Sequence, residues 1–134
     1  MKQINNKGKQ MSNKKVALIT GASSGIGKSI AEYLHQKGMI VYGTSRKPKL
    51  SEINSIKLLP LDVTKVGTIE NTVAKIIKHE GRLDVLVNNA GMGITGPIED
   101  TPTDEMRRVF NTNFFGAIDV MKGVIPQMRQ QKSG

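Results

Sequence analysis

Short apolar runs alternate along the chain with longer segments in which apolar residues recur every three or four positions. The run Lys15–Thr20 (KVALIT) is almost wholly apolar and stops at a glycine, which is typical of a buried parallel strand. In the next segment Ile26, Ile30 and Leu34 recur at helical spacing, so one face of that helix is apolar. The same pattern predicts strands at 15–20, 39–44, 56–61 and 83–87, and helices at 26–37, 66–79 and 102–131.

Turn and cap residues bound these predicted helices. Gly38 and Gly81 follow the first two helices, where glycine favours the left-handed backbone of a C-terminal cap. At the start of the third helix, Thr101 is expected to be the cap and Pro102 the first helical residue. Asp104 then supplies the acid of a capping box.

Strands that alternate with helices predict an α/β fold with a doubly wound parallel sheet. Right-handed crossovers give the strand order 3-2-1-4. We expect this Rossmann domain to occupy residues 14–134 and to stop, incomplete, after its third long helix. Residues 1–13 contain lysines but no acid and no apolar period, so we expect a solvated, disordered basic leader.

Composition excludes several classes of function. The net charge of +9 is concentrated near the N-terminus and lacks interleaved aromatic residues, so we expect no nucleic-acid partner. The sequence contains no run of eighteen apolar residues, so we expect no segment that spans a membrane. The absence of cysteine removes disulfides and thiolate ligands, and we expect a cytoplasmic protein. His35 and His79 lack ligand spacing, so we interpret them as surface residues and expect no metal site.

The glycine-rich segment Thr20–Gly27 (TGASSGIG) joins the first predicted strand to the first helix. Glycine is needed where the backbone turns with positive φ or approaches a ligand closely. The helix start then offers N–H groups to a pyrophosphate. One alternative is a P-loop ending in Gly27-Lys28-Ser29, with Asp62 as the magnesium-side acid, although its first glycine would fall on Ala22. A structural turn without a ligand is a second alternative.

Two segments, TGASSGIG at 20–27 and NNAG at 88–91, together resemble the short-chain dehydrogenase/reductase family, in its branch with one compact Rossmann domain. The resemblance covers residues 14–134. It implies an oxidoreductase that transfers a hydride between a nicotinamide dinucleotide and a small carbonyl or alcohol substrate. Turn residues would line the phosphates and ribose, Asp62 and Val63 would hold the adenine, and Asn89, Ala90 and Gly91 would lie beside the ribose and pyrophosphate. The turn residues are Gly21, Ser23, Ser24, Gly25, Ile26 and Gly27.

The side chains of Asn88 and Asn89 have a second interpretation, in which they tie the sheet together by satisfying buried backbone groups. Both interpretations can hold at once.

Arg46 indicates which dinucleotide is bound. NAD enzymes of this fold carry an acid about 20 residues after the turn, where it accepts a hydrogen bond from the ribose 2′-hydroxyl. The segment Thr44–Lys47 has no acid and presents Arg46 instead. A guanidinium group binds a 2′-phosphate that an acid would repel. We therefore expect NADP(H), while NAD(H) stays open.

The third predicted helix carries a stripe of residues at steps of three and four, in which Asn113 is the one polar member. An amide on an apolar face needs partners, because an unpaired one costs about 1–3 kcal/mol. Asn113 is then a core asparagine bonded to backbone, or it has the role that the resemblance implies. In that role the asparagine of the N-x-x-G stretch perturbs the helix and helps to hold a water of the proton relay, which makes Asn113 the candidate catalytic residue. The stripe, expected to face the sheet, is Met106, Phe110, Asn113, Ala117, Val120 and Val124.

The family's other catalytic groups, a serine and a Tyr-x-x-x-Lys pair, are expected beyond residue 134. We assign neither tyrosine of this chain, Tyr33 or Tyr42, to that pair. The 134-residue chain alone is therefore expected to be inactive. A dinucleotide-binding module without turnover is the alternative. In the family the third helix packs against its copy in another subunit, so we predict a homo-oligomer for the intact protein.

Overall fold

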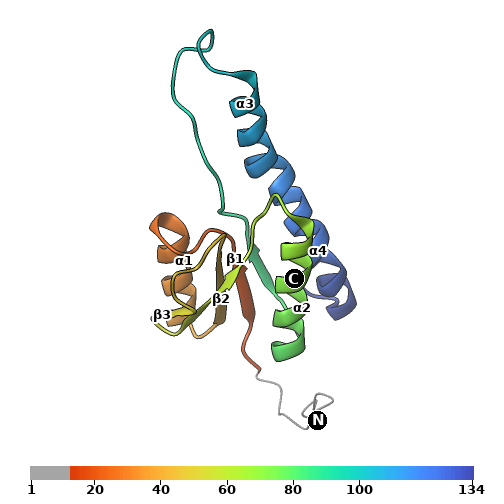
Figure 1. Ribbon diagram of the computed structural model, residues 1–134. Coiled ribbons are helices and arrows are strands. Elements are labelled where there is room, and N and C mark those ends of the chain that lie inside the picture. Colours follow the sequence, from red (N-terminus) through yellow and green to blue (C-terminus); the bar gives the residue numbers. More distant parts are fainter. Residues whose placement is uncertain (1–12) are drawn as a thin grey trace.

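The computed structural model describes residues 13–134 (Figure 1). The predicted leader, residues 1–13, lies outside these residues except for Asn13. The strands are β1 Val16–Ile19, β2 Ile40–Ser45, β3 Glu52–Ile53, β4 Ile56–Pro60 and β5 Val85–Val87. The helices are α1 Gly25–Gln36, α2 Val66–Glu80, α3 Thr103–Phe110 and α4 Gly116–Gln131, with a π-helical turn, η1 Asn111–Phe115, between the last two.

All strands belong to one sheet in the order β3-β4-β2-β1-β5. Strand β1 pairs in parallel with β2 and β5, and β2 pairs in parallel with β4. These are the four predicted strands in the predicted order 3-2-1-4, so the α/β doubly wound sheet is confirmed. Strand β3 was not predicted; it pairs antiparallel with β4 through a turn at Asn54 and Ser55, both with positive φ.

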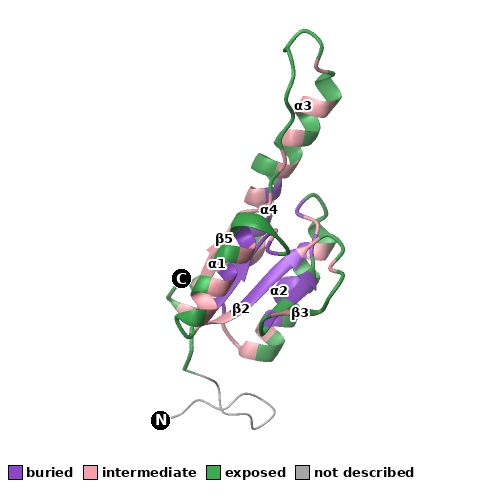
Figure 2. Cartoon of the chain, turned by 90° about the vertical axis from the view of Figure 1, so that its left-hand side faces the viewer, coloured by how far each residue is buried: buried purple, intermediate pink, exposed green. Residues whose placement is uncertain are grey.

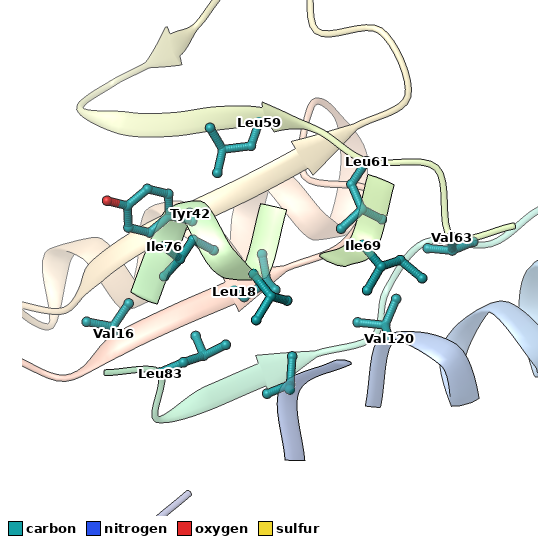
Figure 3. Packing of buried hydrophobic residues seen from close by; sticks show 12 residues of the cluster. Val16, Leu18, Tyr42, Leu59, Leu61, Val63, Ile69, Ile76, Leu83 and Val120 are labelled. Atoms are coloured by element: carbon teal, nitrogen blue, oxygen red, sulfur yellow. The ribbon is translucent and has the colours of Figure 1, made fainter. Parts of the chain in front are cut away.

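Helices cover the two faces of the sheet. On one face α2 and α4 pack against alternate strand residues, including Val16 and Leu18 of β1, in the larger buried cluster (Figure 3). On the other face Ala31 of α1 packs against Ala17 and Ile19 of β1. Both faces of β1 are fully buried, as its continuous apolar run predicted. The sheet is therefore the rigid body from which the loops at its carboxyl edge project.

Helix α3 extends beyond the sheet. Together with η1 it forms a helical arm, residues 103–115, that is mostly exposed (Figure 2). Its first residue is Thr103, and Pro102 occupies the cap position with an extended ψ of 133°. The predicted cap at Thr101 is wrong, because that hydroxyl donates to the carbonyl of Pro97 at 2.8 Å. The helix begins one residue later than expected, and Asp104 lies in its first turn without a capping hydrogen bond.

Two left-handed glycines end the first helices as predicted. Gly81 has a φ of 74° and donates to the carbonyl of Ile77, and Gly38 has a φ of 86° and donates to the carbonyl of His35. No helix among residues 13–134 is long and apolar enough to cross a membrane.

The predicted stripe on the third helix is only partly buried. Val120 and Val124 are fully buried against the sheet, whereas Phe110 is 62% exposed, so its expected position against the sheet is wrong. The π-helical turn η1 lies between these residues and rotates α3 relative to α4. Helix α3 also extends past the sheet (Figure 1), which is consistent with the exposure of Phe110.

A buried carboxylate ties β1 to the start of β5. Asp84 accepts the backbone N–H of Val16 at 2.8 Å and pairs with both Nε and Nη2 of Arg82. Burial alone would raise the pKa of Asp84, but the hydrogen bonds from Arg82 and Val16 outweigh it and hold this pKa below its ordinary value. The ionised form therefore stabilises the fold.

We expect Asp84→Asn to lower the free energy of unfolding at pH 7 by about 2 kcal/mol, the value of a charge-assisted hydrogen bond. Because the folded pKa is depressed, the contribution is complete above the unfolded value of about 4 and disappears as pH falls through the folded pKa. Urea unfolding of both proteins at several pH values should therefore show a difference that shrinks in acid. Asp100→Asn, at an exposed position, is the control; a gap that is constant with pH would contradict the assignment.

Candidate functional site

The glycine-rich segment forms a tight turn between β1 and α1. Gly21 and Gly25 have φ values of 68° and 56°, which other residues adopt only with strain. Gly27 is required for another reason, since a Cβ there would overlap the carbonyl oxygen of Gly21 and the amide of Asn89. Helix α1 begins at Gly25, so its first N–H groups and positive dipole end lie at this turn.

The NNAG segment holds this turn in place. The side-chain amide of Asn89 donates to the carbonyls of Thr20 and Gly21, both at 3.0 Å. In return the Thr20 hydroxyl accepts the backbone N–H groups of Asn89 and Ala90, also at 3.0 Å. The structural interpretation of Asn89 is therefore confirmed. Its predicted role beside a cofactor stays a prediction.

An open cavity of about 610 Å³ lies at the carboxyl edge of the sheet, within the range of small-molecule sites. It brings together most of the predicted cofactor-binding residues. Gly27 is buried inside the turn, while Gly25 and Ile26 line a neighbouring hollow on the outer side of α1. The predicted residues that line the cavity are Gly21, Ser23, Ser24, Arg46, Asp62, Val63, Asn89, Ala90 and Gly91.

Six further residues, which are not among the predicted cofactor-binding residues, also line this cavity. Ser45 ends β2, while Leu61 and Thr64 follow β4, and their position after predicted strands was a usable signal. Arg108 and Thr112 come from the helical arm, and nothing in the sequence pattern distinguishes them from other polar helix residues. The full set of six is Ser45, Leu61, Thr64, Met92, Arg108 and Thr112.

Charge at one end of the cavity is mainly positive. Arg46 also lines an adjoining hollow that contains Lys47 and Lys65, and Asp62 is the one carboxylate lining either space. Asp62 accepts hydrogen bonds from the Thr64 hydroxyl at 2.7 Å and the Thr64 N–H at 3.0 Å. The hydroxyl lowers the pKa of Asp62 most, and Lys65 and Arg46 lower it further against the opposing effect of burial. Asp62 is thus an ionised acceptor at neutral pH.

Asn113 lies in η1 and binds the loop that follows NNAG. Its Oδ1 accepts the N–H of Met92 at 2.9 Å, and its Nδ2 donates to the carbonyl of Met92 at 2.8 Å. The amide does have backbone partners, as expected, but Asn113 is exposed, so its interpretation as a core asparagine is wrong. The helix is also perturbed here, because Asn113 is the middle residue of the π-helical turn. Nearby, Asn88 donates to the carbonyl of Ala117 at 3.1 Å, which is a structural role as well.

Removal of this amide is expected to loosen the loop at Met92. Asn113→Ala deletes both hydrogen bonds to Met92, worth together about 2 kcal/mol. Amide hydrogen exchange at Met92 should then be faster by roughly 30-fold, because local opening costs correspondingly less. Asn111→Ala is a matched control in the same turn, since the Asn111 side chain makes no such bond to the loop. Equal exchange rates at Met92 in wild type and Asn113→Ala would contradict this role.

Comparison with known proteins identifies the family. Residues 15–134 match the family described as short chain dehydrogenase. The chain belongs to this family. It is 48% identical over 119 residues to a 3-ketodihydrosphingosine reductase of Bacteroides thetaiotaomicron, covering 89% of this chain and 44% of that protein. It is 38% identical over 130 residues to the uncharacterized oxidoreductase YxjF of Bacillus subtilis, covering 90% and 51%.

Solved structures of short-chain dehydrogenases have the same fold. The aldohexose dehydrogenase of Thermoplasma acidophilum superposes with a TM-score of 0.81 at 36% identity, over 87% of this chain and 45% of that one. ElxO with NADP bound superposes with a TM-score of 0.83 at 35% identity, over 90% and 53%. The chain thus spans about half the length of the relatives it matches, and their remaining halves have no counterpart among residues 13–134.

The catalytic pair of a short-chain dehydrogenase has the spacing Tyr-x-x-x-Lys, and Tyr33 and Lys37 do have that spacing, which the sequence analysis passed over. Tyr33 is 57% exposed, on the outer face of α1, and the Lys37 ammonium lies 5.4 Å from its ring centre. Tyr33 lines a hollow on the outer side of α1, and neither Tyr33 nor Lys37 lines the cavity. Tyr42 is buried, bonded to Glu80 and Lys57, and its pKa is raised by burial and by Glu80. Neither tyrosine reaches the cavity.

The P-loop alternative requires Lys28 to point at a bound phosphate. Its ammonium instead lies 3.9 Å from the carboxylate of Glu32, one turn further along α1, and Lys28 lines the outer hollow. The geometry therefore does not support a phosphate-binding lysine at this position.

The two histidines differ from each other. His79 is exposed as expected, but the Nδ1 atom of His35 is buried without a hydrogen-bond partner, so the interpretation of His35 as a surface residue is wrong for that atom. No group of His, Asp and Glu with metal-binding geometry is present in residues 13–134.

Proposed function

We propose that the intact protein transfers a hydride between NADP(H) and a carbonyl or alcohol substrate. The observation that carries this proposal is the cavity at the carboxyl edge of the sheet, where the glycine turn and Arg46 meet. The turn offers helix N–H groups to a pyrophosphate. Arg46, Lys47 and Lys65 supply positive charge where a 2′-phosphate would lie, opposite a single carboxylate. ElxO, a structural neighbour, binds NADP in the same fold, which supports the choice.

The roles of the individual residues follow from their positions. Ser23 and Ser24 would bind the phosphates, and Asp62 would accept a hydrogen bond from the adenine amino group while the backbone N–H of Val63 donates to the ring. Gly91 would let the ribose approach the backbone. When bound, the nicotinamide ring supplies or accepts the hydride. Asn113 would hold a water near Met92 as part of a proton path, in addition to fixing the loop.

Among residues 13–134, no tyrosine, lysine or histidine lines the cavity to donate a proton. A neutral amide such as Asn113 is not a useful acid at neutral pH. Tyr33 and Tyr42 lie away from the cavity, so we propose that the serine and the Tyr-x-x-x-Lys pair belong to the part of the intact protein beyond residue 134. The 134-residue chain by itself should then bind the dinucleotide without turnover.

The first substrate to test follows from one of the relatives named above. Because a 3-ketodihydrosphingosine reductase is 48% identical over 119 residues, we propose a long-chain 3-keto amine or a similar apolar ketone as the substrate class. Met92 lines the cavity, which supports an apolar wall there, whereas Ile94 lines a separate hollow with Pro97.

The experiment is a titration of the intact protein with NADPH, NADH and magnesium-ATP, followed by an NADPH-oxidation assay with a panel of ketones. We expect the tightest binding for NADPH and turnover with at least one apolar ketone. Binding of magnesium-ATP without dinucleotide binding would overturn the proposal in favour of a nucleotide hydrolase. Dinucleotide binding without turnover on any substrate would favour the non-catalytic module.

We also propose that the intact protein is a cytoplasmic homo-oligomer. Exposed apolar side chains lie on α3, η1 and α4, and large exposed apolar patches mark interaction sites. Light scattering at micromolar concentration is the test, and a monomer would contradict the proposal. The exposed residues are Phe110, Phe114, Phe115, Met121 and Ile125.

A further inference from the structure

The wall of the cavity opposite the sheet is formed by the helical arm, through Thr112 and Arg108. Their position follows from the packing of the next helical turn. Gly116, the first residue of α4, lies so close to Val63 that a Cβ on it would come within 2.7 Å of the valine Cγ2. Thr112 and Arg108 precede Gly116 by four and eight residues. The arm therefore rises from Val63 and carries Arg108 over the segment 62–64, which lines the same cavity.

The guanidinium of Arg108 is oriented by a neighbour on its own helix. Its Nη2 lies 2.8 Å from Oε2 of Glu105, one turn earlier. No other hydrogen bond or ion pair of this guanidinium is found within residues 13–134. Arg107, the adjacent residue, lies on another side of α3, against a hollow formed with Met106 and Phe110. Two arginines that are neighbours in sequence thus differ in whether they line the cavity.

A guanidinium group at this point suits one end of a dinucleotide. The group is planar, remains charged at all relevant pH values, stacks on aromatic rings and donates several hydrogen bonds at once. Val63 and Asp62 line the cavity below it, where the proposed function has the adenine, and Arg46 lies at the end of β2. We propose that Arg108 is a cofactor-binding residue that covers the adenosine end of the dinucleotide, held in orientation by Glu105. This inference rests on the proposed function.

The test compares Arg108→Gln with Arg107→Gln, which removes the same charge one residue away. The intact protein is titrated with NADPH and with adenosine 2′,5′-bisphosphate, which represents the adenosine end alone. For Arg108→Gln we expect both dissociation constants to rise about tenfold, and for Arg107→Gln to stay within about twofold. The two probes should respond equally, because the contact is assigned to the adenosine end. Circular dichroism melting checks that each variant is folded.

Each outcome separates this inference from the function on which it rests. If wild type binds neither probe, the proposed function fails and the inference fails with it. If wild type binds both and Arg108→Gln binds them equally well, Arg108 has no role and the proposed function stands. A loss for NADPH alone would show that Arg108 contacts another part of the cofactor, and would overturn the assignment to the adenosine end. If Arg108→Gln does not fold, Arg108→Lys is used, for which we expect about a threefold loss because an ammonium cannot stack as a planar group does.

Discussion

Replacement of Gly27 by alanine is expected to lower the free energy of unfolding by about 3 kcal/mol, the upper part of the range for overpacking a closely packed position. An added Cβ would overlap the Gly21 carbonyl and the Asn89 amide, and it would lie 3.0 Å from the Gly21 carbonyl carbon. None of these atoms is the end of a flexible side chain with room to move, because Gly21 is backbone and Asn89 is fixed by two hydrogen bonds.

The same substitution should also abolish dinucleotide binding. Relief of the overlap requires the turn to separate from the NNAG segment, and both segments line the cavity. Loss of the Asn89 bonds would leave the Thr20 and Gly21 carbonyls without these partners, which adds to the cost. Equilibrium unfolding in urea, with circular dichroism as the signal, measures the first effect, and NADPH titration measures the second.

Gly67→Ala is the matched control for this prediction. Gly67 lies in the first turn of α2, where a Cβ would meet nothing within 4 Å. Alanine there should raise stability by up to about 1 kcal/mol, the usual gain for replacing a helical glycine. If Gly27→Ala unfolds at the same urea concentration as wild type and still binds NADPH, the close approach at Gly27 is required neither for stability nor for dinucleotide binding.

The sequence predicted those parts of the fold in which burial leaves a local pattern. Strand β1 is buried on both faces and therefore reads as an unbroken apolar run. Helix α2 buries Ile69, Val73 and Ile76 on one side, so its period was visible. Strand β3 left no such pattern, because it has only two residues and its turn uses Asn54 and Ser55 at positive φ without a glycine. A hairpin signal based on glycine could not detect it.

The pattern of apolar and polar residues could not predict features that depend on contacts between distant segments. The π-helical turn at Asn113 accompanies its hydrogen bonds to Met92, 21 residues away, and period analysis cannot register such a contact. Gly21 was predicted from the glycine spacing and Asp62 from the family resemblance, and both line the cavity because parallel strands bring their carboxyl ends to one edge. Arg108 lies on an exposed helix, where an arginine is ordinary, and only the packing of Gly116 on Val63 relates it to the cavity.

Reversal of charge at Arg46 is expected to change the cofactor preference of the intact protein. Arg46 follows the last residue of β2 and lines both the cavity and the adjoining cationic hollow. Arg46→Asp would remove a charge-assisted contact to a 2′-phosphate, worth about 1.5–3 kcal/mol, and would add a repulsive carboxylate. The ratio of NADPH to NADH affinity should therefore fall by about 100-fold. A carboxylate at this position can also accept a hydrogen bond from the free 2′-hydroxyl of NADH, which increases the shift.

The control is Lys49→Asp, the same reversal three residues further along, at an exposed position that lines neither space. It changes the net charge equally, so any general loss of attraction between the protein and an anionic cofactor appears in both variants. That general loss weakens with salt, whereas the contact at Arg46 acts at short range and should persist at higher ionic strength. Titrations with NADPH and NADH at two salt concentrations therefore separate the two effects. An affinity ratio for Arg46→Asp that matches Lys49→Asp at both would mean that Arg46 does not contact the 2′-phosphate, and that NADP(H) is not selected at this position.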